Sequence, residues 1–343
     1  MEFFHLSRQL SAMHSRPATT TLRGTPLPDP PPQGGREPDR TGGISAACKN
    51  VPPPPLRGRV GEGGDDAARS PRIVTQGRAE IGFAVRAGVT RLKHLYQHDP
   101  LRVLFPLAPA GDVPVAALVT TSGGLVGGDR IEIVATVGAD ARALVAPQAA
   151  EKIYRSLGEA ATVEIALEVG THGWLEYLPL ETILFDGSRL DRRCRIELAD
   201  GGRAMAGEIL VFGRRARGEV MATGTVRDAI EVRRGGRLIW ADAFDLRDAP
   251  ARLDHAAGLG GAHALASLIY VGDDAASLVE PVRDLQAQAP DSAAGATAIG
   301  PVLIARWAGR DVVAMRRAYA TVWQALRARA AGLPPVLPRL WHV

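Results

Sequence analysis

Two stretches of alternating polar and apolar residues decide the fold of this chain: residues 130–137 read RIEIVATV, and residues 162–169 read TVEIALEV. Successive side chains of a β-strand point to opposite faces, so a period of two gathers the apolar residues on one face. Each stretch ends at a glycine-containing turn, and an apolar segment resumes at 143–146 or 174–177. The pattern predicts half-buried strands, each forming a hairpin with the segment that follows it.

The same period of two continues toward the C-terminus. Residues 190–198 place Cys194 and Ile196 on one face and arginines on the other, and residues 230–232 and 238–240 flank a Gly-Gly turn. No helical pattern separates these strands, which argues against the βαβ alternation of a parallel sheet. The sequence therefore predicts a mostly β fold, as a large antiparallel sheet, a sandwich or a coiled β layer.

A C-terminal α-helical section is predicted to follow the strands. A short helix is expected over 275–288, after an apolar strand at 265–271, and a longer helix over 311–331 ends at Gly332 and two prolines. The apolar stripe of the longer helix comprises Val312, Met315, Tyr319, Val322, Trp323 and Leu326. Its other side is expected to carry Arg316, Arg317, Arg327 and Arg329. Packing of the stripe against the β layer is the favoured interpretation, and a partner-docking face is the alternative.

Residues 1–75 differ in composition from the rest, since they hold twelve of the 25 prolines. Proline and glycine runs remove backbone donors and leave no periodic apolar face, so this segment is predicted to be a disordered extension. It lacks the basic and apolar regions of a secretory signal peptide. A proline-rich ligand for a partner, or a start codon assigned too far upstream, are the alternatives. Residues 76–343 then form one β-rich scaffold domain.

Composition excludes several classes of protein. Hydrophobic residues make up 46% of the chain, and no apolar run reaches the roughly 18–20 residues of a membrane span. A net charge of +4 without a concentrated basic patch gives no support to nucleic-acid binding. Cys48 and Cys194 lie far apart in the sequence, which predicts neither a disulfide scaffold nor a zinc site and fits a reducing cytoplasm.

The glycine-rich stretch at 122–129, SGGLVGGD, is the most conspicuous motif, and it fails as a nucleotide site. A P-loop needs lysine and serine or threonine where Asp129 and Arg130 stand, and a Rossmann fingerprint must open a helix, whereas a strand follows here. A tight connection between strands is the favoured interpretation. His94 and His98 have the spacing of a helical metal pair, but without a third ligand a solvated polar pair is favoured. No convincing active site emerges.

Four blocks of the sequence carry a resemblance to a known family. They are LVTTSGGLVGGD at 118–129, APQAAEKIYRS at 146–156, WLEYLPLETILFDG at 174–187 and GEILVFGRRARGE at 207–219. Together they resemble the signature blocks of the UreD family, also called UreH, of urease accessory proteins. The resemblance extends from about Gly82 to PRLW at 338–341 and leaves out the proline-rich extension.

The resemblance implies a maturation scaffold that has no catalytic activity of its own and works in the cytoplasm. Such a protein binds apo-urease and, with UreF and the GTPase UreG, enables installation of the nickel centre, while UreE acts indirectly as the nickel donor. Nickel would be bound only transiently, and the absence of a soft-ligand cluster in the sequence is coherent with that. Neither nucleic acid nor a membrane is expected as a partner.

Site residues are expected within the four blocks and the long helix. Carboxylates proposed to line a transient nickel route are Asp129, Glu176, Glu181, Asp186 and Glu208. Residues proposed to bind partners are Glu151, Lys152, Tyr154, Arg155, Arg214, Arg215 and Trp323. The alternative is that the carboxylates cap turns and pair with nearby lysine and arginine side chains. At the level of function, the alternative is a β-rich hydrolase or a carbohydrate-binding module.

Overall fold

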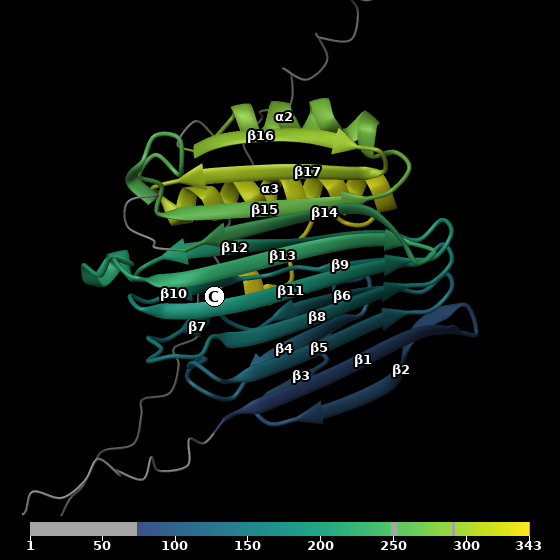
Figure 1. Ribbon diagram of the computed structural model, residues 1–343. Helices are drawn as coiled ribbons and strands as arrows, with labels where there is room; N and C mark the ends of the chain where they lie inside the picture. The colour runs from purple at the N-terminus through teal and green to yellow at the C-terminus, as the bar shows by residue number, and fades with distance from the viewer. Residues whose placement is uncertain (1–73, 248–252, 290–291, 343) are drawn as a thin grey trace, which may run out of the picture. The chain divides into compact units, whose positions relative to one another are not determined.

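Two β-sheets and a helical layer make up the part of the chain that the computed structural model describes, residues 74–247, 253–289 and 292–342 (Figure 1). The disordered extension predicted for residues 1–75 falls almost entirely outside these residues, so it stays a prediction, and Cys48 lies outside them too. The mostly β fold with a C-terminal helical section is confirmed. None of the described helices is long and apolar enough to cross a membrane.

Sheet A has seven strands, five of them parallel. In spatial order they are β14 (Arg237–Leu246), β13 (Gly224–Arg234), β11 (Ser188–Leu198), β8 (Ala161–Val169), β5 (Arg130–Val137), β1 (Gln76–Arg86) and β2 (Val89–His98). The two edge strands, β2 and β14, run antiparallel to their neighbours. The hairpin predicted around the Gly-Gly turn is confirmed, because β13 pairs with β14.

Sheet B has ten strands and joins a parallel half to an antiparallel half. Its main path is β16 (Ser292–Ile299), β17 (Val302–Gly309), β15 (Ala264–Val271), β12 (Arg203–Phe212), β9 (Trp174–Tyr177), β6 (Arg142–Pro147), β4 (Val115–Thr120) and β3 (Leu101–Leu104). Two short strands complete it beside β12, namely β10 (Glu181–Leu184) and β7 (Glu151–Ile153).

The chain coils between the sheets, which corrects the predicted pairing. β5 does not form a hairpin with β6, nor β8 with β9, because β5 and β8 lie in sheet A and the strand that follows each of them lies in sheet B. After one full turn the chain returns beside its previous strand in the same direction, so the pairing is parallel although no helix lies between. The prediction of a mainly antiparallel sheet was wrong for this half, whereas the coiled β layer is confirmed.

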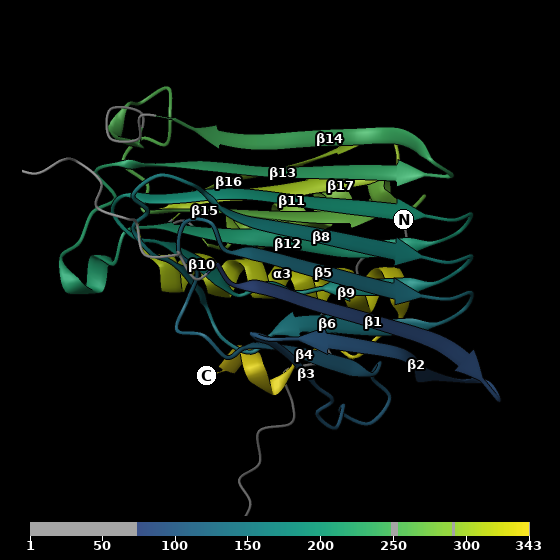
Figure 2. The same ribbon diagram turned by 60° about the horizontal axis from the view of Figure 1, so that its bottom comes forward.

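Alternating burial along the strands creates the inner core. In β8 every second side chain, from Ala161 to Val169, is buried between the two sheets, while Glu164 and Glu168 are exposed on the outer face. The other face of sheet B packs against the helices, so sheet A, sheet B and α3 lie one behind another (Figure 2).

The long helix α3 (Val312–Ala331) begins and ends as its sequence predicts. The Asp311 side chain accepts hydrogen bonds from the N–H groups of Val313 and Ala314, and Gly332 ends the helix with a positive φ of 62°. Trp323 is fully buried against sheet B, which confirms core packing of the apolar stripe. The shorter predicted helix consists of a 3₁₀ turn, η2 (Ala275–Leu278), followed by α2 (Val279–Ala287).

Candidate functional site

A cluster of ionisable side chains lies between sheet A and sheet B, around a cavity of about 80 Å³. The ionisable residues that line it are Glu151, Tyr177, Arg192, Cys194, Glu208 and Asp228. They come from both sheets: Arg192, Cys194 and Asp228 project from sheet A, and the others from sheet B. Such groups are rarely fully buried unless they are paired, so their presence in an apolar core marks this cavity as a candidate site.

Arg192 holds the cluster together with all three of its guanidinium nitrogens. Its Nε donates to Asp228 Oδ1 at 2.9 Å and its Nη1 to Thr182 Oγ1 at 2.9 Å. Its Nη2 lies 3.1 Å from Glu208 Oε2 and also donates to Asp228. One cation therefore faces two carboxylates across the space between the sheets.

Burial shifts the pKa values of the ionisable side chains that line the cavity. It raises the pKa of Glu208 well above its ordinary value, and the neighbouring Asp228 carboxylate raises it further, against the opposing effect of Arg192. Burial likewise raises the pKa of Glu151 and raises the pKa of the Cys194 thiol to about 12. The raised pKa favours the neutral form of Glu208, so Asp228 becomes the principal counter-ion of Arg192.

A second cluster lies where β7, β10 and β12 end together, since these strands are parallel. Arg155 Nη2 is 2.6 Å from Asp186 Oδ2, and the Arg214 guanidinium sits 4.2 Å from the centre of the Phe185 ring. Tyr154 packs edge-on against the same ring, with centroids 4.9 Å apart. We call these five residues the loop-end cluster. It joins the second, third and fourth of the sequence blocks.

Asp186 anchors this cluster through the backbone. It accepts hydrogen bonds from the N–H groups of Ala222 and Thr223, at 3.0 and 2.8 Å, and from the Thr223 hydroxyl. Burial opposes ionisation of Asp186, but these hydrogen bonds and Arg155 outweigh it and lower the pKa of the carboxyl group. Arg155 and Arg214 remain exposed beside it.

Asp129 closes the glycine-rich connection between β4 and β5. Its carboxylate accepts from the N–H groups of Thr75 at 3.0 Å and Val126 at 2.9 Å. Gly124, with a φ of 149°, passes so close to the backbone of Lys152 that a Cβ atom would lie 2.6 Å from the Lys152 carbonyl oxygen. The predicted role of the glycines as a tight connection between strands is confirmed, and β5 follows with no helix between.

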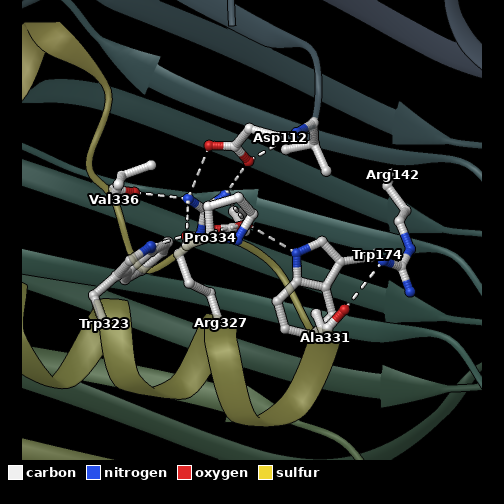
Figure 3. A network of polar contacts seen from close by, with 10 residues as sticks. Asp112, Arg142, Trp174, Trp323, Arg327, Ala331, Pro334 and Val336 are labelled. Atoms are coloured by element: carbon white, nitrogen blue, oxygen red, sulfur yellow. Dashed lines mark hydrogen bonds and ion pairs between the residues drawn. The ribbon is translucent and has the colours of Figure 1, made fainter. Parts of the chain in front are cut away.

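Glu176 is fully buried on the other side of sheet B, beneath α3. It accepts from the indole N–H groups of Trp174 and Trp323, both at 2.9 Å, and lies 3.1 Å from Arg327 Nη2. Figure 3 shows Arg327 reaching from α3 to Asp112 and to the carbonyl oxygens of Pro334 and Val336. Burial raises the pKa of Glu176 despite the opposing charge of Arg327.

The structure thus separates the predicted nickel-route carboxylates. Only Glu208 reaches the cavity, and Glu181 forms an ion pair with Arg316 at 3.3 Å near α3. No grouping of three or more His, Cys, Asp or Glu side chains suited to a metal ion occurs within residues 74–247, 253–289 and 292–342. His94 and His98 lie on β2 and not on a helix, so their four-residue spacing separates them by roughly 13 Å.

The predicted partner-binding residues are also divided. Tyr154, Arg155 and Arg214 meet in the loop-end cluster, while Lys152 is exposed on β7 and Arg215 begins the 3₁₀ turn η1 (Arg215–Arg217). Glu151 faces the cavity and accepts a hydrogen bond from the Thr120 hydroxyl at 3.0 Å. Trp323 is fully buried, so its side chain does not form a docking surface in this structure, because α3 uses it to pack on sheet B.

Comparison with known proteins identifies the family. A family model described as "UreD urease accessory protein" matches residues 75–342. The chain belongs to the UreD family. Curated proteins called "Urease accessory protein UreD" resemble it along most of their length. That of Magnetococcus marinus is 42% identical over 279 residues, which cover 80% of this chain and 96% of the relative. That of Methylobacterium sp. is 39% identical, with 78% and 95% covered.

Membership of the UreD family confirms the resemblance first seen in the four blocks. The matched segment, 75–342, begins where the proline-rich stretch ends and includes both the cavity and the loop-end cluster. Of the residues that line the cavity, sequence reasoning indicates Glu208 and Glu151 but not Arg192, Asp228 or Tyr177. The sequence does contain a signal for Arg192 and Asp228. Each occupies a position of its strand where the alternating pattern predicts a buried apolar side chain.

Proposed function

We propose that this UreD protein is a cytoplasmic urease maturation scaffold without catalytic activity of its own. It binds apo-urease and, with UreF and the GTPase UreG, enables incorporation of the nickel centre, with UreE as an indirect nickel donor. The observation that carries this proposal is the family match over residues 75–342.

The loop-end cluster is the surface we assign to partner binding. Arg155 and Arg214 are exposed there beside the aromatic rings of Tyr154 and Phe185. Arginine and aromatic side chains are enriched at the energetic centres of protein interfaces. Arg155 and Arg214 already pair with Asp186 and Glu219, so the exposed Lys152 supplies the additional positive charge that an acidic side chain of a partner would meet here.

We also propose that nickel passes through the cavity and binds transiently to Glu208, with Glu151 lining the same cavity. Oxygen ligands hold nickel weakly compared with thiolates or imidazoles, and the ion must displace a proton from Glu208, whose pKa is raised. Both effects favour transient binding. For Asp129, Glu176, Glu181 and Asp186, a place on the route stays a prediction, since in this structure their oxygens accept backbone or indole N–H groups or pair with arginine.

The decisive experiment is co-expression of urease subunits, UreF and UreG with and without this chain, followed by affinity purification and a urease assay. We expect apo-urease to co-purify with the chain and urease activity to require it. Equal activity without the chain would contradict the proposal.

Glu208→Gln separates the role in nickel delivery from a role in folding. Glutamine resembles the neutral carboxylic acid, so stability should change by less than about 0.5 kcal/mol at neutral pH. Nickel in the purified urease, measured by elemental analysis, should nevertheless fall several-fold, because an amide cannot lose a proton to solvent and become an anionic ligand for nickel. Glu164→Gln, on the exposed face of β8, is the control and should load nickel normally. Normal loading by Glu208→Gln would remove Glu208 from the route.

A further inference from the structure

Strand β2 forms one edge of sheet A (Figure 2). Among residues 74–247, 253–289 and 292–342 it pairs only with β1, and nine of its ten residues are exposed. In an edge strand about half of the backbone N–H and C=O groups have no strand partner. Proteins usually shorten or cover such edges, because the unpaired backbone groups can bind a strand of another chain. A regular edge strand of ten residues therefore offers a site that another strand can join.

Apolar side chains continue from the core onto this edge. Leu92 lies opposite Phe83 of β1, and the Phe105 ring packs edge-on against Phe83 with centroids 6.4 Å apart. The large apolar side chains left exposed here are Val89 (50%), Leu92 (39%), Leu95 (40%), Tyr96 (45%) and Phe105 (42%). A partner that covered them would extend the existing core by one strand.

The charge of the edge is positive. Arg86, Arg91 and Lys93 are exposed, and within the described part of the chain none of them lies within ion-pair distance of a carboxylate. The nearest acidic residue along the hairpin, Glu80, is already bound by Arg78 and His94, both within 2.8 Å. Lys93 occupies the β-bulge opposite Gly82 and Phe83.

We propose that β2 is the docking edge for an acidic, extended segment of a partner protein, which joins sheet A as an additional strand. Backbone groups of β2 would pair with the segment, its apolar side chains would cover Leu92 and Leu95, and its carboxylates would pair with Arg91 and Lys93. A second copy of this chain fits poorly, because two β2 strands would bring like charges together. The inference rests on the proposed function, which makes the partner one of the maturation proteins.

The test uses the full-length chain carrying Arg91→Glu and Lys93→Glu, purified with apo-urease, UreF and UreG. We expect the affinity for the one protein that supplies the segment to fall roughly ten-fold or more. Arg189→Glu with Arg195→Glu makes the same charge change at exposed positions of β11 that form no ion pair within the described residues, and it should leave every affinity unchanged. Hydrogen exchange on the unaltered complex gives a second readout, since the amides of Val89–His98 should gain protection.

Unchanged affinities together with unchanged exchange in β2 would overturn the docking edge while leaving the maturation role intact. Failure of the unaltered chain to bind any maturation protein would defeat the proposed function and this inference with it. Binding of vesicles containing anionic lipids that is lost in the β2 variant, with protein affinities retained, would show a membrane-binding hairpin and overturn the proposal as well.

Discussion

We expect Arg327→Met to lower the free energy of unfolding by about 3–5 kcal/mol, the range found when one partner of a buried ion pair is removed. Arg327 is fully buried and forms ion pairs with Asp112, at 2.6 Å, and Glu176, at 3.1 Å. It also donates to the Pro334 and Val336 carbonyl groups, both within 3.0 Å. Methionine fills similar space but removes the positive charge that both carboxylates contact and the donor that the two carbonyl groups share. Urea unfolding followed by tryptophan fluorescence measures the loss.

The loss should grow as the pH rises. Burial already raises the folded-state pKa of Glu176, and removal of the Arg327 charge that opposes burial would raise it further. A carboxyl group whose folded pKa exceeds its unfolded pKa contributes stability at pH values below the unfolded pKa, and that contribution is lost as the pH increases. The difference between the Arg327→Met variant and the parent protein should therefore be larger at pH 8 than at pH 5.

Two further variants distinguish charge from packing. Adding Glu176→Gln to Arg327→Met should recover about 1–3 kcal/mol, because the neutral amide needs no cation and its oxygen still accepts from one of the two indole N–H groups that Glu176 binds. Arg329→Met, on the exposed side of the same helix, should change stability by less than about 0.5 kcal/mol. A small, pH-independent effect of Arg327→Met would show that the buried pair contributes nothing to holding α3 on sheet B.

Sequence periodicity located the strands but not their partners. The stretches at 130–137 and 174–177 coincide with β5 and β9, because alternation reports which side chains face a core. It carries no information on which strand lies alongside. A short turn after β5 is compatible with a hairpin and also with a crossing to the opposite sheet, and the structure uses the crossing. Parallel pairing therefore could not be deduced from the pattern alone.

Two arginines, Arg192 and Arg327, lie inside the protein although their faces were predicted to be exposed, and the reason is the same for both. Arg192 has the same phase in β11 as Leu190 and Cys194, and Arg327 follows Trp323 by four residues, one helical turn. Their charge alone predicts a place on the solvent face, yet their positions in the period place both side chains inside. A charged residue in the buried phase of an element is therefore the sequence signal for both internal clusters. The carboxylates that pair with them come from other elements, which no local pattern connects.

Arg192→Met is expected to have the second large effect, again about 3–5 kcal/mol of unfolding free energy. Arg192 lies between Asp228 and Glu208 and supplies the positive charge that both carboxylates contact. Glu208 already has a raised pKa, caused by burial and by Asp228, so removal of the cation leaves at least one buried carboxylate without a counter-ion. Denaturation midpoints in urea measure the loss.

The phase of β11 supplies a matched control for this variant. Arg193 is the next residue, points to the outer face and is largely exposed, so Arg193→Met should change stability by less than about 0.5 kcal/mol. Adding Asp228→Asn to Arg192→Met should restore part of the stability, because one neutral amide and one protonated Glu208 need no cation. The loss should diminish toward acidic pH, because the raised pKa of Glu208 lets that carboxyl group become neutral and reduces the need for a cation. Equal losses for Arg192→Met and Arg193→Met would show that the internal cluster is not held by charge, and the nickel passage proposed at Glu208 would lose its electrostatic basis.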